Sequence, residues 1–168
     1  MALLQFVLAI ALVLTQHSRK LGGATTMTRH TGIKLLAGFM GLYHILMGIV
    51  GIVSGSWAAW GAHTLWHATV TVDPQFTYLA KFLGAYVVAF GVMLLLIAKD
   101  PVRYGALVYP AVIVAVLRIG ERLVFAGELK SAFGIGMDRT IGTIVVVGIL
   151  NLGLLMLKPR EPYLPSRS

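Results

Sequence analysis

Arg118, Glu121 and Arg122 lie inside a segment that is otherwise apolar enough to cross a bilayer. Ionised side chains at that depth are costly, so they usually pair with one another or take part in binding or transport. Arg118 and Glu121 are three residues apart and share one face of a helix, which favours an ion pair. We therefore expect Glu121 to neutralise Arg118. Arg122 is expected to extend toward the membrane surface along its methylene chain.

Lys81 and His44 complete this predicted intramembrane charge cluster. Lys81 is expected at a similar depth, near Glu121, because the helices that carry them are antiparallel. His44 lies near the middle of another apolar segment and is expected to be a neutral imidazole, hydrogen-bonded between helices; a haem or proton-relay ligand is the alternative. The cluster would orient the bundle or bind an anionic lipid head group. The alternatives are that Glu121 carries protons, that the arginines bind an anionic substrate or a quinone head, or that the cluster contacts a buried charge of another subunit.

His63 and His67 are four residues apart, a spacing that places two metal ligands on one helical face. Two histidines fill only half of a tetrahedral site, so copper or zinc binding is the weaker interpretation and no metal is predicted. The tryptophans of the same segment favour the head-group level of a membrane, where a ring that is apolar but carries an N–H is stable. We predict interfacial anchoring by Trp57, Trp60 and Trp66.

Small residues recur at spacings that allow two membrane helices to approach closely. We predict that these glycines are helix-packing positions, within the chain or against another subunit: Gly41, Gly48, Gly51, Gly55, Gly84 and Gly91. Asn151, in the last apolar segment, is expected to donate a hydrogen bond to another helix.

The composition predicts an integral membrane protein, with 58% hydrophobic residues, 12% charged residues and a mean hydropathy of +0.85. About 20 apolar residues are needed to cross the hydrocarbon core. Four segments are predicted to span it: Ile33 to Ser54, Thr77 to Ala98, Tyr104 to Ala126 and Thr140 to Leu157. The predicted fold is an all-α polytopic membrane bundle of four transmembrane helices and a short N-terminal hydrophobic helix.

The net charge of +8 does not indicate a nucleic-acid partner, because the basic residues lie at helix ends and form no single patch. Most of them belong to one face of the predicted bundle: Arg19, Lys20, Arg29, Lys34, Lys99, Arg103, Lys158, Arg160 and Arg167. The positive-inside rule makes that face cytoplasmic, with both ends of the four-span core inside. The expected location is the bacterial inner membrane. The absence of cysteine excludes disulfides and thiolate-ligated clusters.

The predicted organisation has three parts. Residues 1–26 form a short hydrophobic segment that spans or lies in the interface, unless the native chain starts at Met27; residues 27–158 form the bundle; and residues 159–168 form a proline-rich cytoplasmic tail.

Local signals also predict where helices begin and end. Asp73-Pro74 and Asp100-Pro101 have the pattern of a helix start, and the second implies a very short hairpin turn. Pro110 predicts a kink and Gly127 a helix end, followed by a polar loop from Glu128 to Arg139 that contains a turn at Gly134–Gly136.

The segment KLLAGFMGLYHILMGIVG from Lys34 to Gly51, the helix from Lys81 to Ala98, the Asp100-Pro101 hairpin and the arginine-bearing third helix together resemble small four-helix DoxX-like and related uncharacterised bacterial membrane proteins. The resemblance covers about residues 33–157. It implies the four-helix topology and permits a role in a quinone-linked oxidoreductase.

No complete catalytic or cofactor site is evident, so the expected function is a non-catalytic accessory or structural subunit of a larger respiratory, photosynthetic or monooxygenase membrane complex. The expected partners are membrane lipids and other membrane subunits, and a bound lipid or quinone is the only cofactor envisaged. The alternatives are a small proton-coupled transporter and a redox subunit associated with quinone, metal or haem.

Overall fold

The computed structural model describes residues 25–159, with side chains from Arg29 onward. Predictions for the N-terminal hydrophobic segment up to residue 24 and for the tail from residue 160 lie outside the described residues. Within them the chain is all-helical. The elements are α2 (Thr25–Val53), α3 (Gly55–Trp66), α4 (Pro74–Lys99), the 3-10 turn η1 (Gly105–Leu107), α5 (Val108–Val124), α6 (Ala126–Phe133) and α7 (Met137–Leu157).

Three of these helices are long and apolar enough to cross a membrane: α4, α7 and the Arg29–Val53 part of α2. The predicted all-α membrane class is therefore supported by both length and composition. The predicted third span differs, because α5 has only 17 residues and carries three charged side chains.

The region around α5 corrects three local predictions. Pro110 is the third residue of α5, where its missing N–H leaves no intrahelical bond unmade, so no mid-helix kink forms. Gly127 lies inside α6, and the predicted polar loop is largely helical. Gly134, with φ of 69°, ends α6 instead, in the left-handed conformation that glycine adopts without strain. The turn predicted at Gly134–Gly136 is present.

Two aspartates position α4. Asp73 caps its start, accepting a hydrogen bond from the Phe76 amide at 2.6 Å, with Pro74 as the first helical residue, as predicted. Asp100 follows its end, and its carboxylate accepts from the Val102 and Arg103 amides. Asp100 therefore stabilises a turn that leads into η1, and the connection to α5 is longer than the very short turn predicted.

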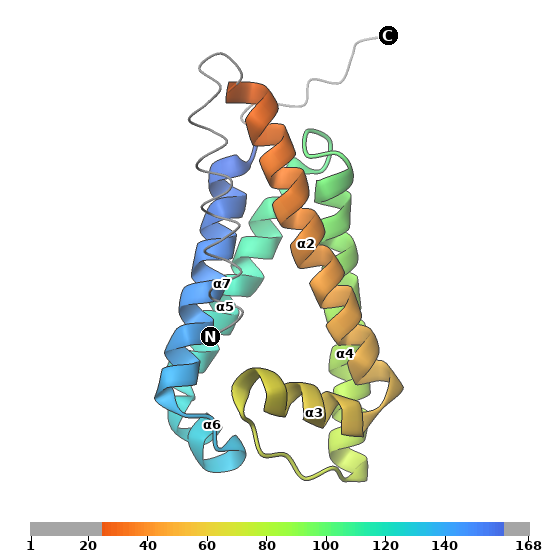
Figure 1. The fold of residues 1–168 in the computed structure, drawn as a ribbon, viewed down its shortest axis with the longest axis vertical. Coiled ribbons are helices and arrows are strands. Elements are labelled where there is room, and N and C mark those ends of the chain that lie inside the picture. The colour runs from red at the N-terminus through yellow and green to blue at the C-terminus, as the bar shows by residue number, and fades with distance from the viewer. Residues whose placement is uncertain (1–24, 160–168) are drawn as a thin grey trace.

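The bundle consists of two helix pairs, α2 with α4 and α5 with α7 (Figure 1). Glycines make the first pair close: a Cβ atom on Gly48 would lie 2.6 Å from the Gly84 carbonyl oxygen, and one on Gly91 would lie 2.7 Å from the Gly41 carbonyl oxygen. Gly51 faces the Ala80 carbonyl and Gly55 faces Thr77 in the same way. Five of the six glycines named from the sequence thus lie between α2 and α4 of one chain, and the sixth, Gly55, begins α3 and faces Thr77 of α4.

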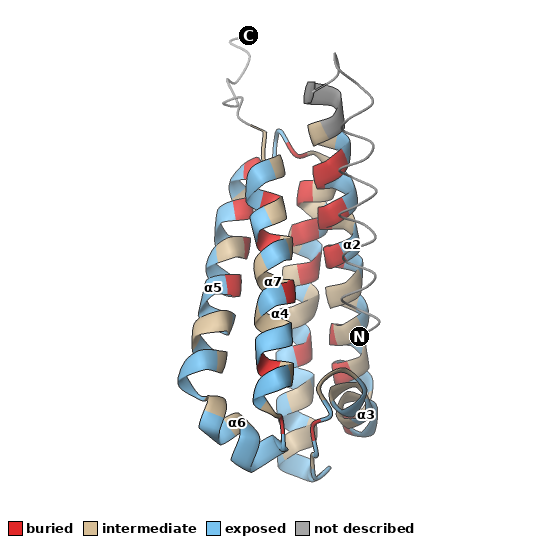
Figure 2. Cartoon of the chain, turned by 60° about the vertical axis from the view of Figure 1, so that its left-hand side comes forward, coloured by how far each residue is buried: buried red, intermediate tan, exposed pale blue. Residues whose placement is uncertain are grey.

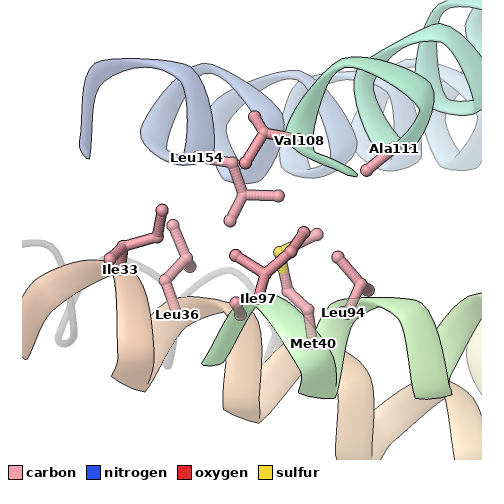
Figure 3. Packing of buried hydrophobic residues seen from close by; sticks show 9 residues of the cluster. Ile33, Leu36, Met40, Leu94, Ile97, Val108, Ala111 and Leu154 are labelled. Atoms are coloured by element: carbon pink, nitrogen blue, oxygen red, sulfur yellow. The ribbon is translucent and has the colours of Figure 1, made fainter. Parts of the chain in front are cut away.

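The two pairs converge at the end where α2 starts and α7 ends, and they diverge toward α3 and α6 (Figure 1). A buried apolar cluster fills the convergent half, which we call the closed end (Figures 2 and 3). It consists of Ile33, Leu36, Ala37, Met40, Leu94, Ile97, Val108, Ala111 and Leu154. A polar contact also joins the pairs at this end, since Arg29 on α2 donates to the Met156 carbonyl of α7 at 2.6 Å. Lys158, directly after α7, donates to the Tyr109 hydroxyl of α5 at 2.8 Å, which ties the second pair together.

At the opposite, open end, α3 lies across the space between the pairs (Figure 1). Ser54 caps the start of α3 through the Trp57 amide. After α3 the Thr69 amide donates to the Phe133 carbonyl at 2.8 Å, which ties this segment to α6. The chain therefore fixes α3 at both of its ends.

Candidate functional site

A cavity of about 460 Å³ lies between the two helix pairs, on the open-end side of the apolar cluster. Most of the side chains around it are apolar, and every long helix contributes to it. Its lining residues are Phe39, Met40, Tyr43, His44, Leu65, Trp66, Phe90, Val114, Ala115, Arg118, Asp138, Arg139, Gly142, Thr143, Val146, Val147, Leu150 and Asn151. On α7 the lining extends from Asp138 to Asn151, so the cavity is about 20 Å long at 1.5 Å per residue.

Arg118 supplies the cation in the middle of this cavity. Its side chain is exposed to the cavity, and its charge acts on both Tyr43 and His44 across the space between α5 and α2. The predicted ion pair with Glu121 is wrong: among residues 29–159 the only ion pair within 4.0 Å joins Arg139 to Asp138. The structure turns Arg118 into the cavity while Glu121 is exposed outside it, so the guanidinium has no carboxylate partner there.

His44 presents a hydrogen-bond acceptor to the same cavity. Its Nδ1 lies 2.7 Å from the Met40 carbonyl oxygen, which can only accept, so Nδ1 carries the proton and donates. The bond stays within α2, which corrects the predicted bond between helices. In the neutral ring Nε2 then keeps a free lone pair. Edge contacts with Phe90 and Tyr43, at ring-centroid distances of 4.9 and 5.5 Å, hold the ring in place.

Asn151 provides a second acceptor at the deepest point of the lining. Its Nδ2 donates to the Val147 carbonyl of its own helix at 2.9 Å, so the predicted bond to another helix is wrong. Its Oδ1 is buried and has no hydrogen-bond partner in the described part of the chain. A buried acceptor without a partner costs roughly 1–3 kcal/mol, so this oxygen favours a ligand that donates to it.

The other members of the predicted charge cluster do not join Arg118 in the cavity. Arg122 packs over the Trp66 ring, with its guanidinium carbon 5.5 Å from the ring centroid. Lys81 is exposed on α4 and forms no ion pair with any carboxylate among residues 29–159. Lys81 and Glu121 therefore remain apart, because α4 and α5 diverge toward the open end (Figure 1).

Of the three tryptophans, two lie outside the cavity and one lines it. Trp57 and Trp60 are exposed, at 59% and 68%, as interfacial anchors would be. Trp66 is half-buried and lines the cavity, where α3 covers its open end.

The mouth of the cavity carries a hydrogen bond that argues against the histidine metal site. Arg139 Nη2 lies 3.1 Å from His67 Nε2, and this contact occupies the nitrogen that a metal would need. His63 and His67 lie side by side, with ring centroids 5.9 Å apart. No third histidine or carboxylate joins them in the described residues to complete a metal site.

Sequence reasoning identified Arg118 and His44 but missed the role of α7. Asn151, Thr143 and Arg139 line the cavity beside them because α7 is packed against α5. The spacing of polar residues along α7 was the available signal. Thr143 lies four residues after Arg139, and Asn151 lies eight residues after Thr143, which brings the three toward one side of the helix.

Comparison of the chain with protein-family models, with curated proteins and with solved structures found no match.

Proposed function

We propose that this chain is an integral protein of the cytoplasmic membrane that binds one small lipophilic molecule within the bilayer, between its two helix pairs. The cavity is the observation that supports it. Ligand sites of about 300–1,000 Å³ that are mostly apolar, with a few polar groups to orient the ligand, are typical of proteins, and helix bundles place them between facing helices. The volume and lining of this cavity fit that description. A quinone is one molecule of this class.

The proposed topology has four spans. At 1.5 Å per residue, α5 and η1 together cover most of the hydrocarbon thickness, and α5 lies beside α7, which is long enough to cross. Four basic residues belong to the closed end, because they lie in the first part of α2, at or just after the end of α4, and directly after α7: Lys34, Lys99, Arg103 and Lys158. By the positive-inside rule the closed end is cytoplasmic, and the cavity faces the outer side.

Cysteine labelling tests this orientation, because the natural chain has no cysteine to give a background signal. Ser131 on α6 and Val102 in the α4–α5 connection are both exposed and lie at opposite ends of the bundle. A membrane-impermeant maleimide should label Ser131→Cys in intact cells and Val102→Cys only after the membrane is permeabilised. Labelling of Val102→Cys in intact cells would reverse the proposed orientation.

Bound molecules test the binding function directly. We expect protein purified in two chemically different mild detergents to release the same small molecule, in near-stoichiometric amount, on solvent extraction and mass spectrometry. Extracts that contain only bulk lipids, in the proportions of the membrane, would count against a dedicated site.

We also propose the expected role as an accessory subunit. In that role the site would hold a lipophilic molecule for a partner protein. The wide apolar outer surface, which includes Leu42, Leu46, Val116 and Leu117, supports it. Stoichiometric co-purification of other membrane chains would support it, and a lone monomer in mild detergent would contradict it.

A further inference from the structure

We infer that the cavity recognises an organic monoanion with a flat apolar body and a hydroxyl group remote from its charge, that is, a hydroxylated aromatic carboxylate. The inference rests on the binding function proposed above and names its ligand class. It depends on three features of the lining: an unpaired cation, acceptors without partners, and apolar walls with several rings.

Charge balance indicates the anion. Among the residues that the structure describes, Asp138 is the only carboxylate that lines the cavity, and it pairs with Arg139 at 3.7 Å near the mouth. Arg118 therefore has no carboxylate partner deeper inside. Arg122, which packs over Trp66, is a second cation whose charge interacts with that of Arg118 and, in the opposite sense, with that of Glu121. A cation in a poorly hydrated site is stabilised by an anion that binds against it, and a guanidinium binds a carboxylate through two parallel hydrogen bonds. A neutral quinone head would leave this charge unbalanced.

Unpartnered acceptors indicate the hydroxyl group. Asn151 is among the lining residues and only 8% exposed, and its Oδ1 is buried without a donor in the described part of the chain. His44 Nε2 is the second acceptor. A carboxylate can satisfy neither of them, because it has no proton to donate. A hydroxyl on the part of the ligand that reaches the deep end can donate to Asn151.

The walls and the volume indicate a flat apolar body. Phe39, Tyr43 and Phe90 supply rings on the α2–α4 side, and Val114, Val146 and Val147 face them from the other pair. Aromatic rings favour a ligand that is itself aromatic, through stacked or edge contacts. A cavity of about 460 Å³ suits a small molecule of this kind and leaves the chains of a two-chain lipid outside.

Three probes separate these features: 6-hydroxy-2-naphthoate, its neutral amide, and 2-naphthoate without the hydroxyl. Binding is measured by equilibrium dialysis against detergent micelles, with protein-free micelles subtracted. We expect the hydroxy acid to bind most tightly. Arg118→Gln should weaken the hydroxy acid by about tenfold or more and the amide by less than about twofold, because only the acid forms charge-assisted bonds with Arg118. Lys130→Gln on exposed α6 removes the same charge outside the cavity and should change neither value.

Asn151→Leu tests the hydroxyl separately. It should weaken the hydroxy acid by about fivefold and leave 2-naphthoate nearly unchanged, because only the hydroxy acid donates to the removed oxygen. Thermal unfolding and size-exclusion profiles show that each variant is folded.

Several results would overturn the inference: no saturable binding of the hydroxy acid, equal affinity for acid and amide, or an unchanged affinity in Arg118→Gln. If the neutral amide or 1,4-naphthoquinone binds tightly and a side chain that fills the cavity abolishes this binding, the binding function stands and only the ligand class is wrong. If no lipophilic probe is affected by filling the cavity, the binding function itself fails.

Discussion

Gly48→Ala should destabilise the bundle by about 2–3 kcal/mol, the upper part of the range for overpacking a tightly packed interface. The added Cβ would lie 2.6 Å from the Gly84 carbonyl oxygen and 2.8 Å from the Val88 amide nitrogen. Both neighbours are backbone atoms of α4, so they cannot turn away as the end of a flexible side chain can. Helices α2 and α4 must therefore separate. Reversible unfolding by SDS in mixed micelles, followed by far-UV circular dichroism, measures the loss.

Gly38→Ala is the matched control for this effect. Gly38 lies on the same helix, and its added Cβ would have only one neighbour, the Ala98 Cβ at 3.7 Å, which is an ordinary contact. Alanine favours helix over glycine by roughly 1 kcal/mol, so this variant should be neutral or slightly more stable. Equal stability of the two variants would show that α2 and α4 are not packed as closely as described.

Gly142→Phe should abolish binding of small molecules to the cavity while the protein stays folded. Gly142 lines the cavity, and a Cβ built there meets nothing within 4 Å, so the ring can enter the empty space without displacing the backbone. A ligand would then have to displace the ring, and we expect affinity to fall by at least about tenfold. Equilibrium dialysis of the naphthalene probes and the extraction of bound molecules both measure this loss.

Gly148→Phe controls for the effect of a bulky side chain on α7. Gly148 is equally free of neighbours within 4 Å but is not part of the cavity lining. Probe binding should therefore persist in this variant. Loss of binding in both variants, or in neither, would contradict a ligand site between the helix pairs.

The sequence was a good guide to the features that depend on one helix at a time. Apolar length predicted α2, α4 and α7, and Asp73 with Pro74 predicted the start of α4, because these signals act between residues that are close in the chain. The small-residue spacing marked the glycines of α2 and α4, although spacing alone left open which helices would meet.

Features that depend on the angle between helices could not be predicted in the same way. Arg118 and Glu121 share a helical face by spacing, yet the divergence of the helix pairs turns Arg118 into a cavity and leaves Glu121 outside it. The break at Phe125 redirects the chain into α6, and no proline or positive-φ glycine marks that position. Asn151 became a candidate ligand group only when α7 was placed beside Arg118 and His44.

The accessibility of two positions on α5 tests most directly whether the bundle is packed at its closed end and holds a cavity toward its open end. Ala111 belongs to the apolar cluster, and Ala115, one turn farther on the same face, lines the cavity. A small anionic methanethiosulfonate added from outside intact cells should modify Ala115→Cys, and prior modification should block probe binding, whereas Ala111→Cys should stay unreactive. Equal reactivity at the two positions, or reaction of Ala111→Cys alone, would contradict the outward-facing cavity on which the proposed function depends.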